Sequence, residues 1–137
     1  LLGKQKDIRV VGDRFVFQSE VLFGSGSAKI GGAGETQLTQ LATTLRDISK
    51  KIPAKINWVL RVDGHTDRIP IRTPKYSSNW ELSSARAISV VKFLTAQGIP
   101  AERLAATGFG EHQPLDARED EIAFRRNRRI ELKLTQR

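Results

Sequence analysis

The feature that most constrains the fold is a strand-like run between two long helical patterns. Residues 56–62 alternate between inward apolar and outward positions on a two-residue period, which predicts a half-buried β-strand. Residues 35–51 and 79–97 instead carry apolar side chains at helical spacing, which predicts two long helices. A strand between two such helices favours folds in which helices cover a sheet.

Shorter segments predict the remaining strands. Residues 8–11 and 14–18 flank Gly12-Asp13, a pair typical of the tight turn of a β-hairpin. Residues 104–108 form a short strand-like run, and residues 129–135 alternate cleanly. In this last strand we expect Ile130, Leu132 and Leu134 to face the core, and Arg129, Glu131, Lys133 and Thr135 to face solvent.

The segments between these elements predict loops and a minor helix. Residues 24–34 are rich in glycine but lack the Gly-Lys-Ser/Thr ending of a phosphate-binding loop. Residues 68–78 are long enough to fold over a site as a flap. Val21-Leu22-Phe23 predicts a strand continuation, and residues 118–127 a short polar helix. The expected fold is an α/β (α+β) two-layer sandwich. About four main strands form its mixed sheet and two long helices cover one face, in the order βαβαββ after a short N-terminal hairpin.

Residue types at the element ends set the expected boundaries. Asn79 suits the N-cap of the second helix, because its side-chain oxygen can accept a hydrogen bond from a free backbone N–H. Gly98 suits the position after that helix, and Pro100 prevents its continuation. We expect Asp63-Gly64 to end the central strand.

The length and composition limit the class of protein. A chain of 137 residues is most simply one domain, and it has no cysteine, which excludes zinc fingers, iron–sulfur sites and cysteine nucleophiles. The chain begins Leu1-Leu2 and has no methionine, so we expect a piece of a longer protein with any membrane anchor upstream. No run approaches the roughly 18 apolar residues that span a bilayer.

The charge is strongly basic, with 23 basic residues against 15 acidic ones and a net charge of +8. Such a balance favours an anionic partner: nucleic acid, a membrane surface or an acidic polymer. A solvated surface without a partner accounts for the same charge. Half of the excess comes from Arg125, Arg126, Arg128 and Arg129.

A polar cluster after the central strand is the main candidate site. Asp63, His65 and Asp67 have a spacing that permits metal binding, but the other histidine, His112, lies in a distant loop. We therefore expect His65 to be structural, bonding to backbone. Two aspartates without a defined separation, and no serine in a nucleophile-elbow pattern, predict that the chain is not an enzyme. We expect no metal and no cofactor.

Asp67 and Arg86 suit the recognition of a small zwitterion. A carboxylate accepts hydrogen bonds from an ammonium group, and the planar fork of an arginine binds a carboxylate. Asn79 and Arg86 are two helical turns apart and share one helix face. The spacing leaves open the alternative that Asp67 and Arg86 pair with each other and only brace the loop.

Four ordered motifs resemble those of a known family. They are Gly64-His65-Thr66-Asp67; Asn79-x-x-Leu82-Ser83-x-x-Arg86-Ala87; Gly108-x-Gly110 with Pro114; and Asn127-Arg128-Arg129-Ile130-Glu131. With Val21-Leu22-Phe23, similar to the family's first-strand motif, they cover about residues 21–134. The chain resembles the OmpA-like peptidoglycan-binding domains of OmpA, Pal and MotB. The sequence around Asn79 and the long proline-containing loop are most similar to the MotB-like branch.

The resemblance implies binding to the meso-diaminopimelate residue of uncrosslinked peptidoglycan stems. Asp67 would take the ammonium group of this residue and Arg86 its carboxylate. The resemblance also implies which residues line the pocket: Thr66, Asn79, Leu82 and Phe23. The family often carries an acid after that phenylalanine, where this chain has Gly24 and Ser25, so we expect a contact from this wall through backbone or none. Arg128 or Arg129 would lie near the ligand.

The resemblance also implies an organisation and a location. Residues 1–20 would form an extension and hairpin leading from a membrane anchor, and residues 21–137 the OmpA-like domain. The whole would be a periplasmic domain of a membrane-anchored protein in a Gram-negative bacterium, tied to the cell wall. Stator-type relatives dimerise, so a homodimer is an expected partner and nucleic acid is not. The alternative function is binding of nucleic acid or an acidic polymer through residues 125–129.

Overall fold

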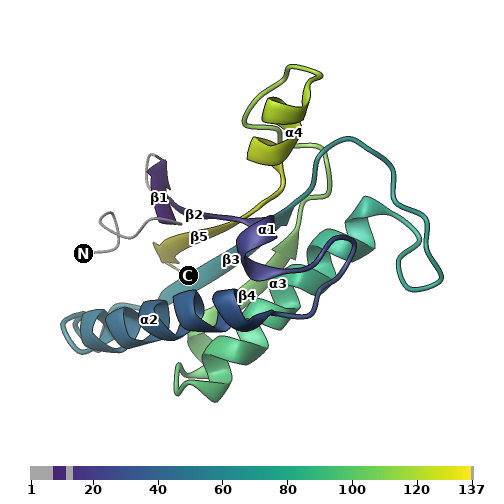
Figure 1. The fold of residues 1–137 in the computed structure, drawn as a ribbon. Coiled ribbons are helices and arrows are strands. Elements are labelled where there is room, and N and C mark those ends of the chain that lie inside the picture. The colour runs from purple at the N-terminus through teal and green to yellow at the C-terminus, as the bar shows by residue number, and fades with distance from the viewer. Residues whose placement is uncertain (1–7, 12–13, 137) are drawn as a thin grey trace.

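The computed structural model of the chain describes residues 8–11 and 14–136, which form the expected two-layer arrangement of a mixed sheet and helices (Figure 1). The strands are β1 (Ile8–Val11), β2 (Arg14–Gln18), β3 (Trp58–His65), β4 (Leu104–Gly108) and β5 (Arg129–Gln136). The helices are α1 (Ser19–Leu22), α2 (Gly32–Ser49), α3 (Asn79–Ala96), the short 3-10 helix η2 (Ala101–Arg103) and α4 (Glu121–Asn127). None of the helices in these ranges is both long and apolar enough to span a bilayer.

The strands form one sheet in the order β1-β2-β5-β3-β4. β3 and β4 are parallel neighbours on either side of α3 in the sequence, and the other neighbouring pairs are antiparallel. β1 pairs with β2 from Ile8↔Phe17 to Val11↔Arg14, which confirms the hairpin, while its turn at residues 12–13 lies outside the described residues. The C-terminal strand β5 therefore joins the hairpin to the rest of the sheet.

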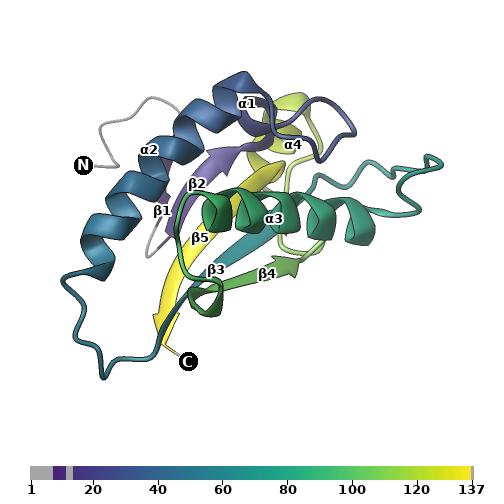
Figure 2. The same ribbon diagram turned by 90° about the horizontal axis from the view of Figure 1, so that it is seen from below.

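Helices α2 and α3 cover one face of the sheet, and the main core lies between the two layers (Figure 2). The apolar stripe that predicted the first helix is buried as expected, with each large side chain contributing about 1.5–3 kcal/mol. This helix supplies Leu38, Leu41, Ala42 and Leu45, and the sheet supplies Phe17, Leu60, Val62, Ile130 and Leu132.

Two glycines bring α3 unusually close to the sheet. A Cβ atom on Gly64 would lie 2.1 Å from the carbonyl oxygen of Ser83, and one on Gly108 would lie 2.0 Å from Oγ of Ser84. The prediction that Asp63-Gly64 ends the strand is wrong, because this glycine serves helix–sheet contact and β3 continues to His65. The close contact fixes the first half of α3 against the end of β3.

The ends and buried face of α3 differ in part from the prediction. Ser78, not Asn79, is the N-cap, and its Oγ accepts a hydrogen bond from the N–H of Trp80 at 3.1 Å. Gly98 follows the helix with φ +97°, as expected. Apolar spacing predicts Ile88 on the buried side of this helix, but Ile88 is exposed while Val90 is buried, because the inward face also carries polar residues. Those polar residues are Asn79, Ser83 and Arg86.

The segment predicted as a strand continuation, Val21-Leu22-Phe23, is not a strand: Val21 and Leu22 form the second half of α1, and Phe23 is the C-cap of this helix. The N–H of Ser19 donates to the carbonyl of Arg128 at 3.0 Å, and the N–H of Phe23 donates to that of Ser19 at 2.8 Å. These bonds turn the chain through one helical turn after β2. Phe23 is thereby placed at the end of the sheet rather than along it.

The exposed side predicted for β5 is partly wrong. Arg129 and Glu131 were expected in solvent, but they are 2% and 1% exposed. Leu134 was expected in the core, but it is 44% exposed. Arg129 donates from Nε to Glu131 at 2.5 Å and from both terminal nitrogens to the carbonyls of Asn127 and Gln113. Charged side chains that satisfy one another therefore shield this face of the sheet.

Candidate ligand-binding site

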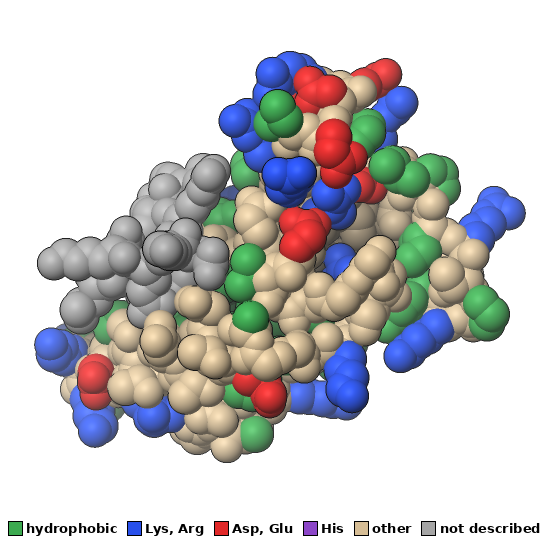
Figure 3. All heavy atoms as spheres, in the orientation of Figure 1, with side chains coloured by type: hydrophobic (Ala, Val, Ile, Leu, Met, Phe, Trp, Pro, Cys, Tyr) green, Lys and Arg blue, Asp and Glu red, His purple; other side chains and the backbone are tan. Residues whose placement is uncertain are grey.

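A pocket of about 440 Å³ lies where α1, the end of β3 and the first half of α3 meet. Figure 3 shows acidic and basic side chains gathered beside a hollow where the α4 protrusion joins the body. The structure brings all six residues of the predicted site into the lining of this pocket: Phe23, Thr66, Asp67, Asn79, Leu82 and Arg86. Their role in binding stays a prediction.

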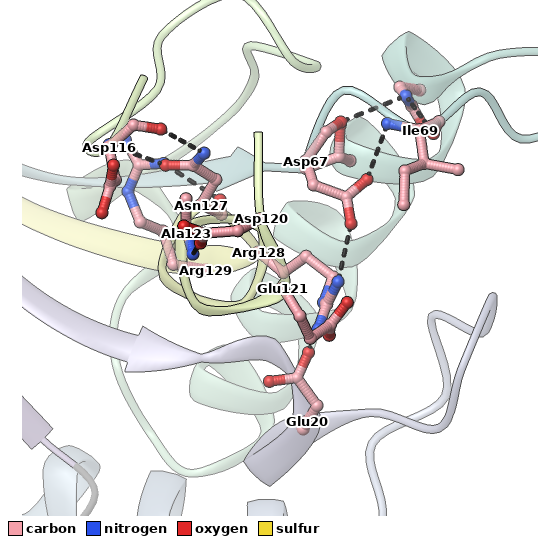
Figure 4. A network of polar contacts seen from close by, with 12 residues as sticks. Glu20, Asp67, Ile69, Asp116, Asp120, Glu121, Ala123, Asn127, Arg128 and Arg129 are labelled. Carbon is pink, nitrogen blue, oxygen red and sulfur yellow. Dashed lines mark hydrogen bonds and ion pairs between the residues drawn. The ribbon is translucent and has the colours of Figure 1, made fainter. Parts of the chain in front are cut away.

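Asp67 follows β3 and is buried at one end of the pocket. Its Oδ1 accepts a hydrogen bond from the N–H of Ile69 at 3.0 Å, and its Oδ2 accepts one from Nη1 of Arg128 at 2.7 Å (Figure 4). The alternative in which Asp67 pairs with Arg86 is wrong for the described residues, since no ion pair joins the two. The two charges instead stand apart in one pocket.

Arg86 is buried on α3 and held in a fixed orientation. Nε donates to the carbonyl of Ser27 at 2.8 Å, Nη2 donates to that of Gly24 at 3.2 Å, and the guanidinium lies 5.1 Å from the ring centroid of Phe23. Burial lowers the pKa of Arg86, which nevertheless stays charged. Within the described part of the chain Nη1 has no partner, so it is available to an anionic ligand.

Thr66 and Asn79 shape the Asp67 end of the pocket. Oγ1 of Thr66 donates to the carbonyl of Asp67 at 2.8 Å. Nδ2 of Asn79 donates to the carbonyl of Ile69 at 3.1 Å and to Glu111 at 3.2 Å. Both side chains brace the backbone on either side of the carboxylate, which keeps it aimed into the cavity.

The long loop at residues 68–78 packs against the glycine-rich loop and forms a wall. Tyr76 is buried beside Ala28 and Leu82, with Ile71 packed against this small cluster. Ile71 also lines the pocket, together with two neighbours in the loop. Part of the predicted flap is therefore a fixed boundary of the cavity.

Arg128 and Glu20 are pocket residues that the six-residue prediction omitted. Arg128 bonds three carboxylates from three elements: Glu20 at 2.6 Å, Asp67 at 2.7 Å and Glu121 at 3.0 Å (Figure 4). Burial lowers the pKa of Arg128, but these hydrogen bonds outweigh it and raise the pKa above its usual range. Glu20 was missed because it precedes every motif and lies between the predicted strand at residues 14–18 and its predicted continuation at residues 21–23.

Two other arginines of the same segment have partners outside the pocket. Arg129 is buried in the sheet, and Arg126 bonds Asp116 at 3.0 Å. Oδ1 of Asn127 accepts hydrogen bonds from two backbone N–H groups before α4. Of the two arginines expected near a ligand, the structure places Arg128 in the pocket and Arg129 outside it.

The structure does not bring Asp63, His65 and Asp67 together as a possible metal site. Asp63 and His65 converge with Glu131, with one candidate ligand atom from each within 4.8 Å, and Asp67 lies in the pocket instead. Guanidinium groups already bond both carboxylates and would repel a cation. They belong to Arg61 on Asp63, and to Arg14 and Arg129 on Glu131.

His65 is a buried structural residue, but it does not bond to backbone as expected. Its ring stacks on Phe109 with centroids 4.9 Å apart, and among the described residues neither ring nitrogen has a hydrogen-bond partner. Burial, followed by the charge of Arg129, lowers the pKa of His65 to about 4. The ring is therefore neutral at pH 7.

Comparison with known proteins gives the family. The OmpA family model matches residues 22–128. The chain belongs to the OmpA family. Uncharacterized protein YtxE from Bacillus subtilis is 37% identical over 118 residues, which make up 85% of this chain and 46% of that protein. The chain spans less than half the length of the curated relatives it matches.

Solved structures confirm the OmpA-like fold and the similarity to MotB-like proteins. A MotB-like protein from Desulfovibrio vulgaris has a TM-score of 0.82 at 28% identity, covering 95% of this chain and 79% of that one. The cell wall anchor of the T6SS from Pseudomonas aeruginosa has a TM-score of 0.77 at 32% identity, covering 95% and 87%. As predicted, this OmpA-family domain is not an enzyme.

Proposed function

We propose that the domain binds peptidoglycan through the diaminopimelate residue of an uncrosslinked stem and so anchors a membrane-tethered envelope protein to the cell wall. The supporting observation is one pocket with a buried carboxylate, Asp67, and a separate buried guanidinium, Arg86. The two groups do not neutralise each other. Each is held by hydrogen bonds within the fold, which supports a role for each in binding a ligand group of opposite charge.

The distal centre of diaminopimelate carries an ammonium group and a carboxylate on one carbon. The ammonium group binds Asp67, and the carboxylate binds Nη1 of Arg86, which has no partner among the described residues. Charge-assisted hydrogen bonds of this kind contribute about 1.5–3 kcal/mol each. A ligand that lacks either group makes only one of the two contacts, and the pocket thereby selects the zwitterion.

The anchoring role draws on the named relatives. One solved neighbour is a cell wall anchor, and others are periplasmic domains of MotB. We propose the same compartment here, with residues 1–20 leading from a membrane anchor into the domain at residues 21–137. A Gram-negative source and a homodimer remain predictions, and the relatives include a protein of Bacillus subtilis.

The basic segment at residues 125–129 gives little support to nucleic-acid binding. Phosphate contacts require guanidinium groups that are free to reach a backbone. Here Arg126 and Arg128 bond carboxylates, and Arg129 is buried. Steep, salt-dependent binding to DNA would support this alternative against the anchor.

The test compares two arginines with similar surroundings. Arg86 donates to a backbone carbonyl and lies over Phe23; Arg103 donates to the carbonyl of Trp58 at 2.9 Å and lies over its ring at 4.9 Å, but Arg103 does not line the pocket. In co-sedimentation with purified sacculi, we expect Arg86→Ala to lose about 2–5 kcal/mol of binding free energy and Arg103→Ala to bind normally.

Because Arg86 also holds the loop that contains Gly24 and Ser27, each variant is checked by circular dichroism and thermal unfolding. Asp67→Asn provides an independent variant at the other end of the pocket. A folded Arg86→Ala or Asp67→Asn protein that still binds sacculi normally would overturn the proposed function.

A further inference from the structure

We propose that Glu20 is a specificity-determining residue of the pocket, which holds Arg128 when the ammonium group of a ligand displaces this arginine from Asp67. The inference rests on the proposed function and deepens it, because it names what prepares the carboxylate end of the pocket for a cation. It assigns a role to a residue on α1 that lies outside every recognised motif.

The structure presents a difficulty for any cationic ligand. Oδ2 of Asp67 already accepts a hydrogen bond from Nη1 of Arg128 at 2.7 Å. An ammonium group that bonds the same carboxylate would lie close to this guanidinium, and two like charges at such a distance repel. Arg128 must move away from Asp67, or other anions must offset its charge.

Arg128 has two other carboxylate partners, and they are not equivalent. Glu20 bonds Nε at 2.6 Å, lines the pocket and is 48% exposed. Glu121 bonds Nη2 at 3.0 Å, is 65% exposed and lies outside the pocket lining. Three carboxylates around one guanidinium leave two negative charges in excess. Glu20 is therefore the acid, besides Asp67, that places this excess at the cavity.

The three bonds use three different nitrogens of Arg128, so one can break while two remain. Nη1 releases Asp67, while Nε and Nη2 stay on Glu20 and Glu121. Asp67 keeps its bond from the N–H of Ile69 and offers the freed Oδ2 to the ammonium group. Without the charge of Glu20, Arg128 binds Asp67 more tightly and competes with the ligand.

Glu20 is also the acid on the wall of the pocket that contains Phe23. The lining residues that follow Phe23 carry no charge, since they are Gly24, Ser25 and Gly26. Glu20, three residues before Phe23 and one helical turn away, lies on the same wall of the pocket. It supplies a negative charge to that wall from the opposite side of the phenylalanine.

The experiment measures the preference for a free amine. The purified domain is titrated calorimetrically with a stem tripeptide ending in meso-diaminopimelate, and with the same peptide acetylated on the distal amine. We expect Glu20→Gln to weaken binding of the free-amine peptide about tenfold and to change binding of the acetylated peptide less than about twofold. Glu121→Gln is the matched control, and we expect it to change either affinity less than about threefold, because an exposed charge contributes little.

The outcomes separate this inference from the proposed function. If the unaltered domain binds neither peptide, the proposed function fails and the inference fails with it. If it binds the free-amine peptide but Glu20→Gln keeps the full preference, the inference alone is overturned. An equal loss in Glu121→Gln would also overturn it, since any partner of Arg128 would then serve.

Discussion

Two networks of arginines and carboxylates lie close together in this domain, and they differ in their access to solvent and to a cavity. The pocket network consists of Glu20, Asp67, Glu121 and Arg128. The sheet network consists of Arg14, Arg61, Asp63, Arg129 and Glu131, on the face of the sheet away from α2 and α3. Arg128 and Arg129 are neighbours in sequence and belong one to each network.

The sheet network is closed. Asp63, Arg129 and Glu131 are almost fully buried, and each charge is bonded by another, as buried charges require. The pocket network borders a cavity, and its acids Glu20 and Glu121 reach solvent. The same chemical groups thus form a scaffold where every bond is made within the protein, and a candidate recognition site where they face a cavity.

The largest expected effect comes from opening the sheet network. Arg129→Ala leaves Glu131 buried with one guanidinium partner fewer and removes the bonds to the carbonyls of Asn127 and Gln113. We expect it to lower the free energy of unfolding by about 3–5 kcal/mol, measured by urea denaturation.

Arg128→Ala is the control, because it removes the neighbouring guanidinium from a partly exposed network. We expect this change to cost only about 1–2 kcal/mol of stability. Equal losses in the two variants would show that the networks do not differ in the way described.

A second prediction concerns the pH dependence of the sheet network. His65 lies beside Glu131, and its pKa is about 4 in the folded protein and about 6.5 when unfolded. Between these values the unfolded chain binds more protons, so stability rises with pH. The contribution of neutral His65 to the free energy of unfolding is therefore fully present above about pH 6.5. It declines by up to about 3 kcal/mol as the pH falls to about 4.

The measurement is a series of urea denaturations from pH 4 to pH 7, with His65→Phe as the non-titrating reference. We expect the variant to show a flatter slope in this range, since phenylalanine can stack on Phe109 without binding a proton. Identical slopes for the two proteins would contradict a neutral, buried His65.

The smallest effect is expected for an ion pair that belongs to neither network. Arg68 and Glu119 lie 2.8 Å apart and are 60% and 64% exposed, where solvent screens their attraction. We expect Glu119→Gln to change the free energy of unfolding by less than about 1 kcal/mol and to leave binding to sacculi unchanged. A larger loss of binding would mean that this contact between the long loop and the segment before α4 shapes the pocket.

The sequence predicted the parts of the fold that periodicity controls. The pattern of α2 and the bounds of β4 were confirmed, and so was the pairing of β1 with β2. The six site residues also met in one pocket, because short motifs place Asp67 at a strand end and Arg86 on the helix that packs there.

The wrong predictions share one physical cause: the residues concerned make their decisive contacts with partners that the local sequence pattern does not reveal. Arg129 and Glu131 alternate as a solvent face should, and only their mutual bonding in the folded sheet allows burial. A glycine such as Gly64 is typical of a strand end, and only its contact with Ser83 of α3 explains its place within β3. Glu20 carries no local signal, because its partner Arg128 is 108 residues away.

The proposed anchoring role would put the domain under a pulling force, and the position of β2 determines how the sheet would bear it. Glu20 and Phe23 follow the C-terminal end of β2, so tension between the start of this strand and a ligand in the pocket runs along the strand. β2 would then have to slide lengthwise past β5, and the five residue pairs from Arg14↔Lys133 to Gln18↔Arg129 would share the force at once. A shearing force acts on all five pairs together, whereas an unzipping force would open them one by one. Strand β2 of the hairpin would thereby become part of the mechanical connection.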